Sequence, residues 1–541
     1  MAKNKTKILM VIPKYEPITN KKNYHYSFPM GIPYISASLK KAGYEVNCLN
    51  LNHHDGTIEE TIKKALDKEK YDFVATGNNA LGYWVAKKIL DSAKEHSSKP
   101  KTILGGPIIT SEPKVIFEDL QPDFGIIGEG EETTINLIKG IESKKDLKKI
   151  KSIIYNEKGK TILTEKGKPP MNVDLLPFPD IESFGYSEWL EHSNCNAVPS
   201  HGTFDYPKTY LLVASRSCPF QCTFCYHDNN FYRTRSIKNI MQELNQVIEK
   251  YKINRIIIQD ELFALDQKRL EDFCQEMKKL LQKFPWKIRW FTQMRVDKVN
   301  EKNLLMMKEA GCDIVGYGFE SFNNTVLKSM RKQIRGEQIE KAFYETLKAG
   351  MGIEANFIFG DVAETKETAY ETLNWWKKHA RGQIYLDFIQ PYPDSEIYRH
   401  ALKKGVIKDK LELIQGLGGR GNLVWNFTDN MSNEEVNKLN RDILKALSKY
   451  RKVTKPLSIK KQGRTYSLEV RCPHCHTIYT MQNCIIPNKW FFGFGLTCRN
   501  CNLIYYLASS LKKLAYKNFD KTKMINRLAK KLINSFKPLK V

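Results

Sequence analysis

Residues 217–230 read SCPFQCTFCYHDNN and place three of the chain's twelve cysteines within eight positions. Cys218, Cys222 and Cys225 form a C-x3-C-x2-C array. Three is an odd number for disulfides and one short of a closed four-thiolate metal site. The array therefore predicts a metal site at which one coordination position stays open.

The cysteine array lies near the start of a region, residues 210–404, in which strand-like and helix-like segments alternate. Six such repeats predict a (β/α)6 barrel or partial barrel, with the chemistry at the carboxyl ends of the strands. The expected strands are residues 210–215, 255–260, 288–295, 313–320, 353–360 and 385–390.

Polar residues follow most of these expected strands. Because the carboxyl ends of the strands meet at one rim of a barrel, these side chains are expected to converge there. They are Cys218 after the first strand, Asp260 and Glu261 after the second, Arg295 after the third, and Glu320 and Ser321 after the fourth.

The cysteine spacing, in a loop after the first barrel strand, resembles the radical S-adenosylmethionine (SAM) superfamily. Tyr226, directly after the third cysteine, matches the aromatic residue of that family. The resemblance implies a partial barrel and a 4Fe–4S cluster held by Cys218, Cys222 and Cys225. Because each iron needs one ligand, one iron is left free to bind SAM. A zinc or structural thiol cluster is the alternative.

The resemblance also implies roles for residues further along the barrel. In the segment IIIQDELF, Asp260 or Glu261 would contact the methionine amino group of SAM. In GYGFES, Glu320 and Ser321 would contact the ribose and carboxylate. Arg295 would bind the carboxylate, and a salt bridge with a neighbouring acid is the alternative for this residue.

Residues 7–141 alternate five short apolar strands with helices, which predicts a doubly wound, Rossmann-like parallel sheet. Ligands of such sheets bind at the carboxyl ends of the strands. Those ends are rich in glycine, which lets a flat ligand approach the backbone, although tight turns alone also use glycine. The glycines are Gly77, Gly105, Gly106, Gly128 and Gly130.

A Rossmann-like domain before a radical SAM barrel resembles the cobalamin (B12)-binding subgroup of the superfamily. The resemblance implies that the glycines at the strand ends face a corrin ring. The sequence has no D-x-H-x-x-G motif, whose histidine ligates cobalt in many cobalamin proteins. Cobalamin is therefore expected to bind without a protein histidine ligand, and a domain without cofactor is the alternative.

A second group of cysteines lies near the end of the chain. Cys472 and Cys475 form one C-x2-C pair, Cys498 and Cys501 form another, and 22 residues separate the pairs. Four thiolates at zinc-ribbon spacing predict a closed, structural zinc site. An auxiliary iron–sulfur cluster is the alternative.

The predicted organisation is α/β throughout the two large domains, followed by smaller parts. It comprises a Rossmann-like cobalamin-binding domain at 1–150, a hairpin and linker at 151–207, a radical SAM partial barrel at 208–405, a helical extension at 406–465, a four-cysteine zinc-ribbon-like module at 466–508 and a basic amphipathic tail at 509–541.

The chain is basic, with a formal net charge of +26. From Leu511 to the end, ten Lys or Arg stand against one Asp. Apolar residues recur there at helical spacing: Leu511, Leu514, Met524, Leu528 and Leu532. This tail predicts contact with an anionic surface or a partner, which leaves a peripheral membrane location open. No apolar run is long enough for a membrane span and no secretory signal is seen, so a cytoplasmic location is expected.

The resemblance implies a cobalamin-dependent radical SAM enzyme that methylates an unactivated carbon of a small-molecule or lipid-like substrate. A 5′-deoxyadenosyl radical would take a hydrogen atom, methylcobalamin would supply the methyl group, and flavodoxin or ferredoxin would supply electrons. A radical cyclase of the anaerobic porphyrin-cyclase type is the alternative enzyme. A nucleic-acid-binding protein that uses the ribbon and the tail is the alternative from another class, and nucleic acid is not the expected partner.

Overall fold

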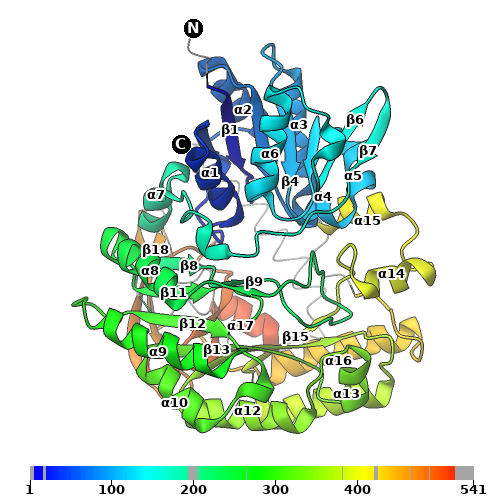
Figure 1. Ribbon diagram of the computed structural model, residues 1–541. Helices are drawn as coiled ribbons and strands as arrows, with labels where there is room; N and C mark the ends of the chain where they lie inside the picture. Colours follow the sequence, from blue (N-terminus) through cyan, green and yellow to red (C-terminus); the bar gives the residue numbers. More distant parts are fainter. Residues whose placement is uncertain are drawn as a thin grey trace.

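The computed structural model describes most of the chain (Figure 1). The described residues are 5–15, 20–192, 204, 206–263, 265–380, 382–418, 424–463, 465–486 and 488–517. Most of the predicted basic tail lies outside them. Among the helices of the described residues, none combines the length and the apolar character that crossing a membrane requires.

The first domain is built on a seven-stranded sheet with the strand order β2-β1-β3-β4-β5-β6-β7. The strands are β1 (Lys7–Ile12), β2 (Glu45–Asn50), β3 (Phe73–Gly77), β4 (Lys101–Gly105), β5 (Phe124–Ile126), β6 (Ile153–Glu157) and β7 (Lys160–Leu163). The first five are parallel, as the sequence predicts, and β6 and β7 are antiparallel.

Helices cover both faces of this sheet (blue to cyan in Figure 1). The helices are α1 (Gly31–Lys41), α2 (Ile58–Lys68), α3 (Tyr83–Glu95), α4 (Pro107–Ser111), α5 (Pro113–Leu120) and α6 (Gly130–Glu142). Alternate residues of β1 point to opposite faces of the sheet. Ile8 and Met10 pack in the cluster that includes α1, whereas Leu9 and Val11 pack against α2 and α3. A central strand buried on both faces reads as a continuous apolar run, which is why KILMVI is so apolar.

The hairpin expected between the domains belongs to the first sheet. Strand β6 pairs with β5, with Phe124 opposite Tyr155. The hairpin thereby covers the edge that β5 would otherwise expose, and the first structural unit extends beyond the predicted boundary at residue 150.

The second sheet has six parallel strands in the order β15-β14-β13-β12-β11-β8, and its two end strands do not pair. It is therefore an open, partial barrel, as predicted. The strands are β8 (Thr209–Leu212), β11 (Arg255–Ile258), β12 (Arg289–Gln293), β13 (Cys312–Glu320), β14 (Gly352–Phe359) and β15 (Ile384–Phe388).

Helices between these strands form the outer layer (green in Figure 1). They are α8 (Ile237–Tyr251), α9 (Gln267–Leu281), α10 (Glu301–Glu309), α11 (Asn324–Ser329), α12 (Gly336–Lys348) and α13 (Lys366–Trp375). Each of the longer ones buries one apolar face; α8, for example, buries Ile240, Leu244 and Ile248 at a helical spacing.

The chain then returns to the first domain. After α14 (Glu396–Lys403), helix α15 (Lys410–Leu417) packs against α3 and α5. Ile414 of α15 is fully buried in a cluster with Tyr83 and Leu104. The predicted helical extension therefore also joins the two large domains, a role that the sequence did not indicate.

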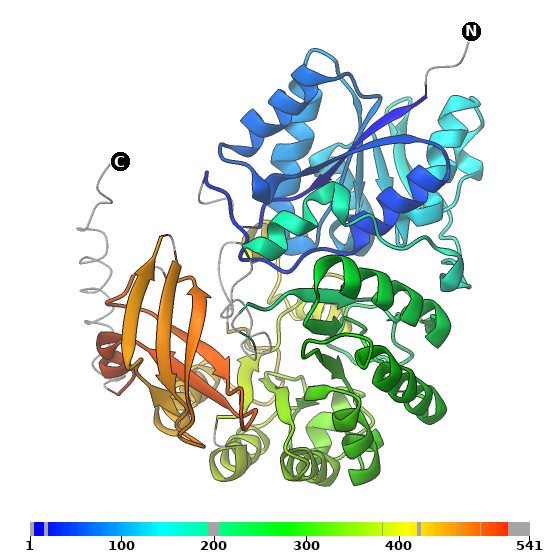
Figure 2. The same ribbon diagram turned by 90° about the vertical axis from the view of Figure 1, so that its left-hand side faces the viewer.

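The C-terminal module stands beside the barrel (orange to red in Figure 2). Helix α16 (Asn433–Tyr450) precedes it and begins at a capping box formed by Ser432 and Glu435. Two three-stranded sheets follow, built from β16 (Val453–Thr454), β17 (Ser458–Gln462), β18 (Thr465–Arg471), β19 (Ile478–Cys484), β20 (Gly493–Thr497) and β21 (Ile504–Ala508). Because β16 and β17 belong to these sheets, the module begins before the predicted residue 466.

The described part of the predicted tail is a short helix, α17 (Ser510–Lys517). It contacts α16 and β21, so its start is packed on the module. Leu511 and Leu514 nevertheless remain 55% and 53% exposed. The other apolar residues predicted for the tail's face, Met524, Leu528 and Leu532, lie outside the described residues.

Candidate active site between the two large domains

The cysteine array lies on a loop, residues 217–232, whose ends are joined by a short antiparallel pair. Ser215 and Arg216 form β9, and Arg233 and Thr234 form β10. The loop is also fixed at its centre, because the Thr223 backbone accepts a hydrogen bond from Ile397 N–H and donates one to the Met330 carbonyl. This cysteine loop is therefore held at the carboxyl-end rim of the barrel.

The three cysteines of the loop are partly or fully buried, and all are free thiols. Burial raises the pKa of each thiol, to about 12 for Cys225. Their sulfurs are not gathered within 4.8 Å of one another, unlike those of the C-terminal cysteines. Three thiolates can bind three irons of a four-iron cluster and leave the fourth iron open.

A lysine that sequence reasoning missed lies beneath the loop. The Lys332 ammonium donates to Glu320 Oε1 at 2.8 Å and is directed toward the Phe224 ring. Burial alone would lower the pKa of Lys332. The interactions with Glu320 and Cys222 have the larger effect, so the pKa of Lys332 is raised. The positive charge of Lys332 in turn acts to lower the pKa of Cys222 and Cys225, and so offsets part of the increase that burial causes.

Glu320 and Ser321, expected at SAM, lie at the end of β13 as predicted. Glu320 has a left-handed backbone, with φ of 61°, and its Oε2 accepts a hydrogen bond from Asn356 at 3.3 Å. The Ser321 hydroxyl lies 3.1 Å from that of Thr372 on α13 and is 1% exposed as a residue. Both side chains are thus engaged within the protein, and their contact with SAM stays a prediction.

Arg295 is held by the chain on every side of its guanidinium. It pairs with Asp297 at 2.8 Å and donates to the Lys332 and Gln333 carbonyls at 3.2 and 2.9 Å. Its guanidinium carbon also lies 3.8 Å from the centroid of the Phe220 ring in the cysteine loop. The structure therefore shows the salt bridge that was the alternative for this residue, and Arg295 supports the loop.

Asp260 and Glu261, which the sequence left as alternatives, have different surroundings. The Asp260 carboxylate accepts hydrogen bonds from Ala214 N–H at 2.7 Å and the Ser215 hydroxyl at 2.6 Å, and burial raises its pKa to about 6. The Glu261 carboxylate has no hydrogen bond to any described part of the chain. Burial and the charges of Asp228 and Asp260 raise its pKa. Glu261 is therefore the acid available to a cationic amino group.

This contrast predicts different phenotypes for the two acids. Glu261→Gln is expected to weaken SAM binding about 10- to 100-fold with unchanged stability, because it removes a charge-assisted contact. Asp260→Ala is expected to lower the free energy of unfolding by about 1–3 kcal/mol, because it orphans the Ala214 N–H. SAM titration and urea unfolding measure the two effects. Normal SAM affinity in the Glu261 variant, with lost affinity in a folded Asp260 variant, would reverse the assignment.

A large cavity, of about 950 Å³, lies over the carboxyl ends of the first sheet. Its floor is apolar, with Met10 from β1, Ala75 from β3 and Ile103 from β4. The glycines predicted from the sequence all line it: Gly77, Gly105, Gly106, Gly128 and Gly130. The strand ends of the first domain thus form a hollow large enough for a bulky flat ligand.

Two of these glycines differ in whether the backbone itself requires glycine. Gly106 has φ of 85°, and a Cβ on it would lie 2.6 Å from the Asn78 carbonyl oxygen. Gly105 has ordinary backbone angles, and a Cβ on it would meet nothing closer than Ile126 at 3.9 Å. The turn itself therefore requires glycine at position 106. At position 105 the backbone would accept a side chain, and glycine leaves that space open.

The cavity wall is completed by residues of the barrel. Val213 and Arg216, which flank the end of β8, line it together with Gly418 after α15. Tyr226 of the cysteine loop also approaches the first domain, since its hydroxyl is buried beside Thr110 of α4 without a regular hydrogen bond. Residues that follow strands of both sheets therefore meet in the wall of this cavity, so the two rims face each other across it.

Buried ion pairs hold the two rims together. Arg216, directly before the cysteine loop, pairs with Glu129 at 2.8 Å and with Glu131 at 2.6 Å. Arg233, directly after the loop, also pairs with Glu129. The acids belong to the GEGEE segment after β5, so its charges fix the cysteine loop against the first domain. Sequence reasoning identified the glycines of this segment and missed its acids.

The family models agree with this division of the chain. Residues 19–138 match the B12 binding domain, and residues 212–375 match the radical SAM superfamily. The chain is a B12-binding radical SAM protein. This confirms the resemblance inferred from the cysteine array and from the glycine-rich strand ends.

Relatives of this B12-binding radical SAM protein include an uncharacterized methyltransferase of Pyrococcus horikoshii, 27% identical over 74% of this chain and 84% of that protein. An anaerobic magnesium-protoporphyrin IX monomethyl ester cyclase of Cereibacter sphaeroides is 26% identical over 71% of this chain and 61% of the cyclase. The fold is similar to that of TsrM, a radical SAM methyltransferase of Kitasatospora setae solved with cobalamin and a 4Fe–4S cluster. The TM-score is 0.59 at 15% identity, over 74% of this chain and 76% of that one.

The cofactors that accompany these two domains are cobalamin, SAM and a 4Fe–4S cluster. The residues present fit each of them. The cavity over the first sheet is lined by glycines. The cysteine loop offers three free thiols, and Glu261, whose charge acts on Cys218, has no hydrogen bond with the described residues.

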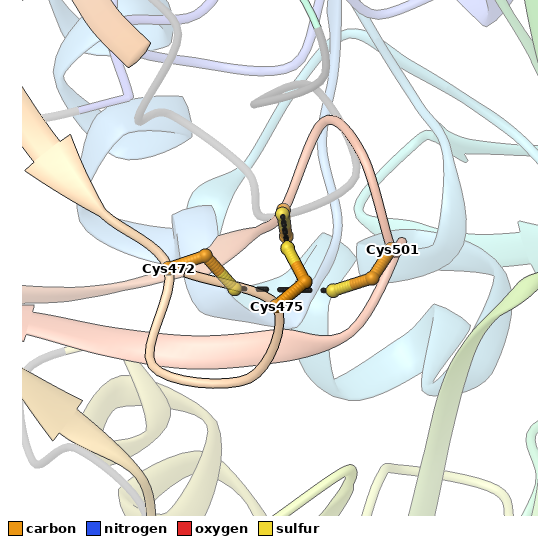
Figure 3. Close-up of side chains that lie close together, drawn as sticks. Cys472, Cys475 and Cys501 are labelled. Atoms are coloured by element: carbon orange, nitrogen blue, oxygen red, sulfur yellow. Dashed lines mark hydrogen bonds between the residues drawn. The ribbon is translucent and has the colours of Figure 1, made fainter. Parts of the chain in front are cut away.

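The four C-terminal cysteines of this radical SAM protein form a compact group whose sulfurs all lie within 4.8 Å of one another. The sulfurs of Cys472 and Cys501 are 3.8 Å apart, and those of Cys475 and Cys498 are 3.6 Å apart. Figure 3 shows the side chains of Cys472, Cys475 and Cys501 pointing toward one another from two facing loops. Cys484, 0% exposed, packs elsewhere in the same apolar cluster.

The module with these four cysteines is attached to the opposite end of the barrel from the cysteine loop. Gln383, before β15, exchanges two hydrogen bonds with the backbone of Ile504 at 2.8 and 2.6 Å. Asn502 donates to the carbonyl of Gly350, before β14, at 3.1 Å. Both contacts are at the amino ends of barrel strands, so this site lies away from the catalytic rim.

Proposed function

We propose that this protein is a cobalamin-dependent radical SAM C-methyltransferase acting on a small-molecule or lipid-like substrate. The observation that carries the proposal is the shared wall of the two sites. Val213 and Arg216 of the barrel line the cavity over the first sheet, so a corrin bound there would face the rim that bears the cysteine loop. A substrate between the rims would be within reach of both.

When bound, the cluster supplies the electron that cleaves SAM, and cobalamin supplies the methyl group. The chain's own residues hold and orient these groups. Cys218, Cys222 and Cys225 would bind the cluster, and Glu261 would hold the amino group of SAM. The paired charges of Lys332 and Glu320 support the loop from below.

The ion pairs between the rims serve the reaction by excluding water and fixing distances. Arg216 and Glu131 are largely buried, with 15% and 5% of their side chains exposed. Separating the partners of such a pair would leave a buried charge uncompensated, which costs free energy. The pairs therefore hold the two rims in one arrangement. The ion pairs would therefore fix the position of the cysteine loop relative to the first domain.

A structural zinc ion is proposed for Cys472, Cys475, Cys498 and Cys501. A tetrahedral site with Zn–S bonds of about 2.3 Å places the sulfurs about 3.8 Å apart. The distances of 3.8 and 3.6 Å in this group support that geometry. An auxiliary iron–sulfur cluster needs thiolates on different irons, hence sulfurs further apart, and is not favoured. The position at the amino ends of the barrel strands also supports a structural role.

The proposed redox partner is a small acidic carrier such as flavodoxin or ferredoxin. A second cavity, of about 1290 Å³, has residues Asp228 to Phe231 of the cysteine loop in its wall. Its lining has more lysines than acids. The lysines are Lys139, Lys145, Lys149, Lys151, Lys166 and Lys168, and the acids are Glu129, Glu132, Asp146 and Asp228. A positive surface so close to the cysteines would steer an acidic donor toward the cluster.

Radical cyclisation remains the second candidate reaction, favoured by the similarity to the magnesium-protoporphyrin ester cyclase. The two reactions differ in their products: methylation adds a methyl group to the substrate, whereas cyclisation adds none and removes hydrogen. A metabolite that accumulates in a deletion strain is incubated with the reconstituted enzyme and SAM carrying a trideuteromethyl group. Transfer of the labelled methyl group to carbon is expected and is read by mass spectrometry. Formation of 5′-deoxyadenosine with a product that gains no label, but loses hydrogen, would establish cyclisation.

A further inference from the structure

The cavity over the first sheet is lined by one cation that forms no salt bridge with a described carboxylate. Its charged lining residues are Lys14, Glu129, Glu131 and Arg216. Arg216 pairs with both glutamates, at 2.8 and 2.6 Å. Among the described residues, no carboxylate lies within ion-pair distance of the Lys14 ammonium. Among the described lining residues, Lys14 is therefore the cation without a salt bridge.

Lys14 is also poorly satisfied by hydrogen bonds. It follows β1 directly after Pro13, and only 4% of the residue is exposed. Its ammonium reaches the carbonyl oxygens of His54 and Gly56 at 3.4 and 3.3 Å, both long distances for such bonds. Burial lowers the pKa of Lys14, and the charge of Asp55 offsets part of that effect. A buried ammonium with three donors and two weak acceptors is costly unless a ligand completes it.

The chemistry of cobalamin offers one matching group. The side chains around its corrin ring are neutral amides, and its only peripheral anion is the phosphodiester that links the corrin to the nucleotide. The apolar floor of the cavity, with Met10, Ala75 and Ile103, suits a ring system and cannot stabilise a phosphate. Among the charged lining residues, the cation available to an anion is Lys14.

We propose that Lys14 binds the phosphodiester of cobalamin, so that the cavity selects complete cobalamin over corrinoids that lack this phosphate. The proposal rests on the proposed function, in which cobalamin occupies this cavity. It assigns to Lys14 a role in recognising the nucleotide side of the cofactor, in a domain whose sequence lacks the D-x-H-x-x-G motif.

Binding of three corrinoids tests the role of Lys14. Aquacobalamin has the phosphodiester and nucleotide, cobinamide phosphate has a phosphate without the base, and cobinamide has neither. Their binding to the full-length protein is followed by the change in corrin absorbance. Wild-type protein is expected to bind cobinamide phosphate about 10- to 100-fold more tightly than cobinamide, the range of a charge-assisted hydrogen bond.

Two variants at position 14 test whether the ammonium group of Lys14 gives this preference for phosphate. Lys14→Met is expected to lose this preference while its affinity for cobinamide stays unchanged, and Lys14→Arg is expected to retain part of it. Lys149→Met is the matched control, because it removes the same charge from the other cavity. It should bind all three corrinoids as wild type does.

Three outcomes would overturn the inference. Wild-type protein that binds cobinamide and cobinamide phosphate equally has no phosphate site, whatever the variants do. A Lys14→Met variant that loses affinity for all three corrinoids alike would show that Lys14 only supports the cavity wall. Wild-type protein that binds no corrinoid while its cluster forms would overturn the proposed function as well.

Discussion

Replacing Cys218, Cys222 and Cys225 together with alanine is expected to abolish SAM cleavage while leaving the C-terminal metal in place. The three thiols lie on one loop, and no other group of cysteines is near the rim in the described parts of the chain. Anaerobically reconstituted wild type should contain about four irons and about one zinc per chain. The triple variant should keep the zinc and lose the iron, and 5′-deoxyadenosine should fall to background.

The reciprocal variant is the control for this experiment. Cys472→Ser with Cys498→Ser breaks both sulfur pairs of the C-terminal site and leaves the loop untouched. It should lose zinc and stability but retain about four irons. Continued SAM cleavage by the triple variant would contradict the assignment of the loop. Iron bound through the C-terminal cysteines would instead favour the auxiliary cluster.

Replacing Gly105 with valine is expected to abolish tight cobalamin binding while SAM cleavage persists. A Cβ at this position meets nothing closer than 3.9 Å, so the strand accepts a side chain. The added methyl groups then occupy space in the cavity, and overpacking of this kind lowers affinity by about 10- to 100-fold or more. Corrin absorbance after gel filtration measures binding, and 5′-deoxyadenosine measures SAM cleavage.

Gly105→Ala is the graded control and should weaken cobalamin binding less than valine does. Gly106 is unsuitable for this test, because its φ of 85° and the Asn78 oxygen at 2.6 Å make any side chain disturb the turn. A Gly105→Val protein with normal cobalamin content and normal methylated product would place the corrin elsewhere. Loss of both activities together, with an intact fold, would show that the two sites are not separable.

The choice between alternative ligands needed the tertiary structure. Asp260 and Glu261 are adjacent in sequence and chemically alike. Only the pairing of β8 with β11 brings Ala214 and Ser215 to Asp260 and so leaves Glu261 available. For Arg295, the sequence left open SAM binding or a salt bridge, and only the tertiary structure shows its contacts with Asp297 and with the carbonyls of residues 332 and 333.

Contacts between distant segments were also beyond the sequence pattern. Lys332 lies in a loop with no periodicity to mark it, and its importance follows from its ion pair with Glu320. Lys14 is one lysine in a chain with 86 basic residues, and only its burial against the cavity distinguishes it. Helix α15 returns to the first domain because Ile414 packs in the apolar cluster of that domain.

The sequence by itself determined the two parallel sheets, the cysteine loop and the glycine-rich strand ends, because these depend on local patterns. Strand periodicity, turn glycines and cysteine spacing are each encoded within a few residues. The tertiary structure alone decided that the rims face each other, that Glu129 and Glu131 lock Arg216 between them, and that the hairpin extends the first sheet. These are long-range contacts, whose free energy depends on which surfaces meet and not on any local pattern.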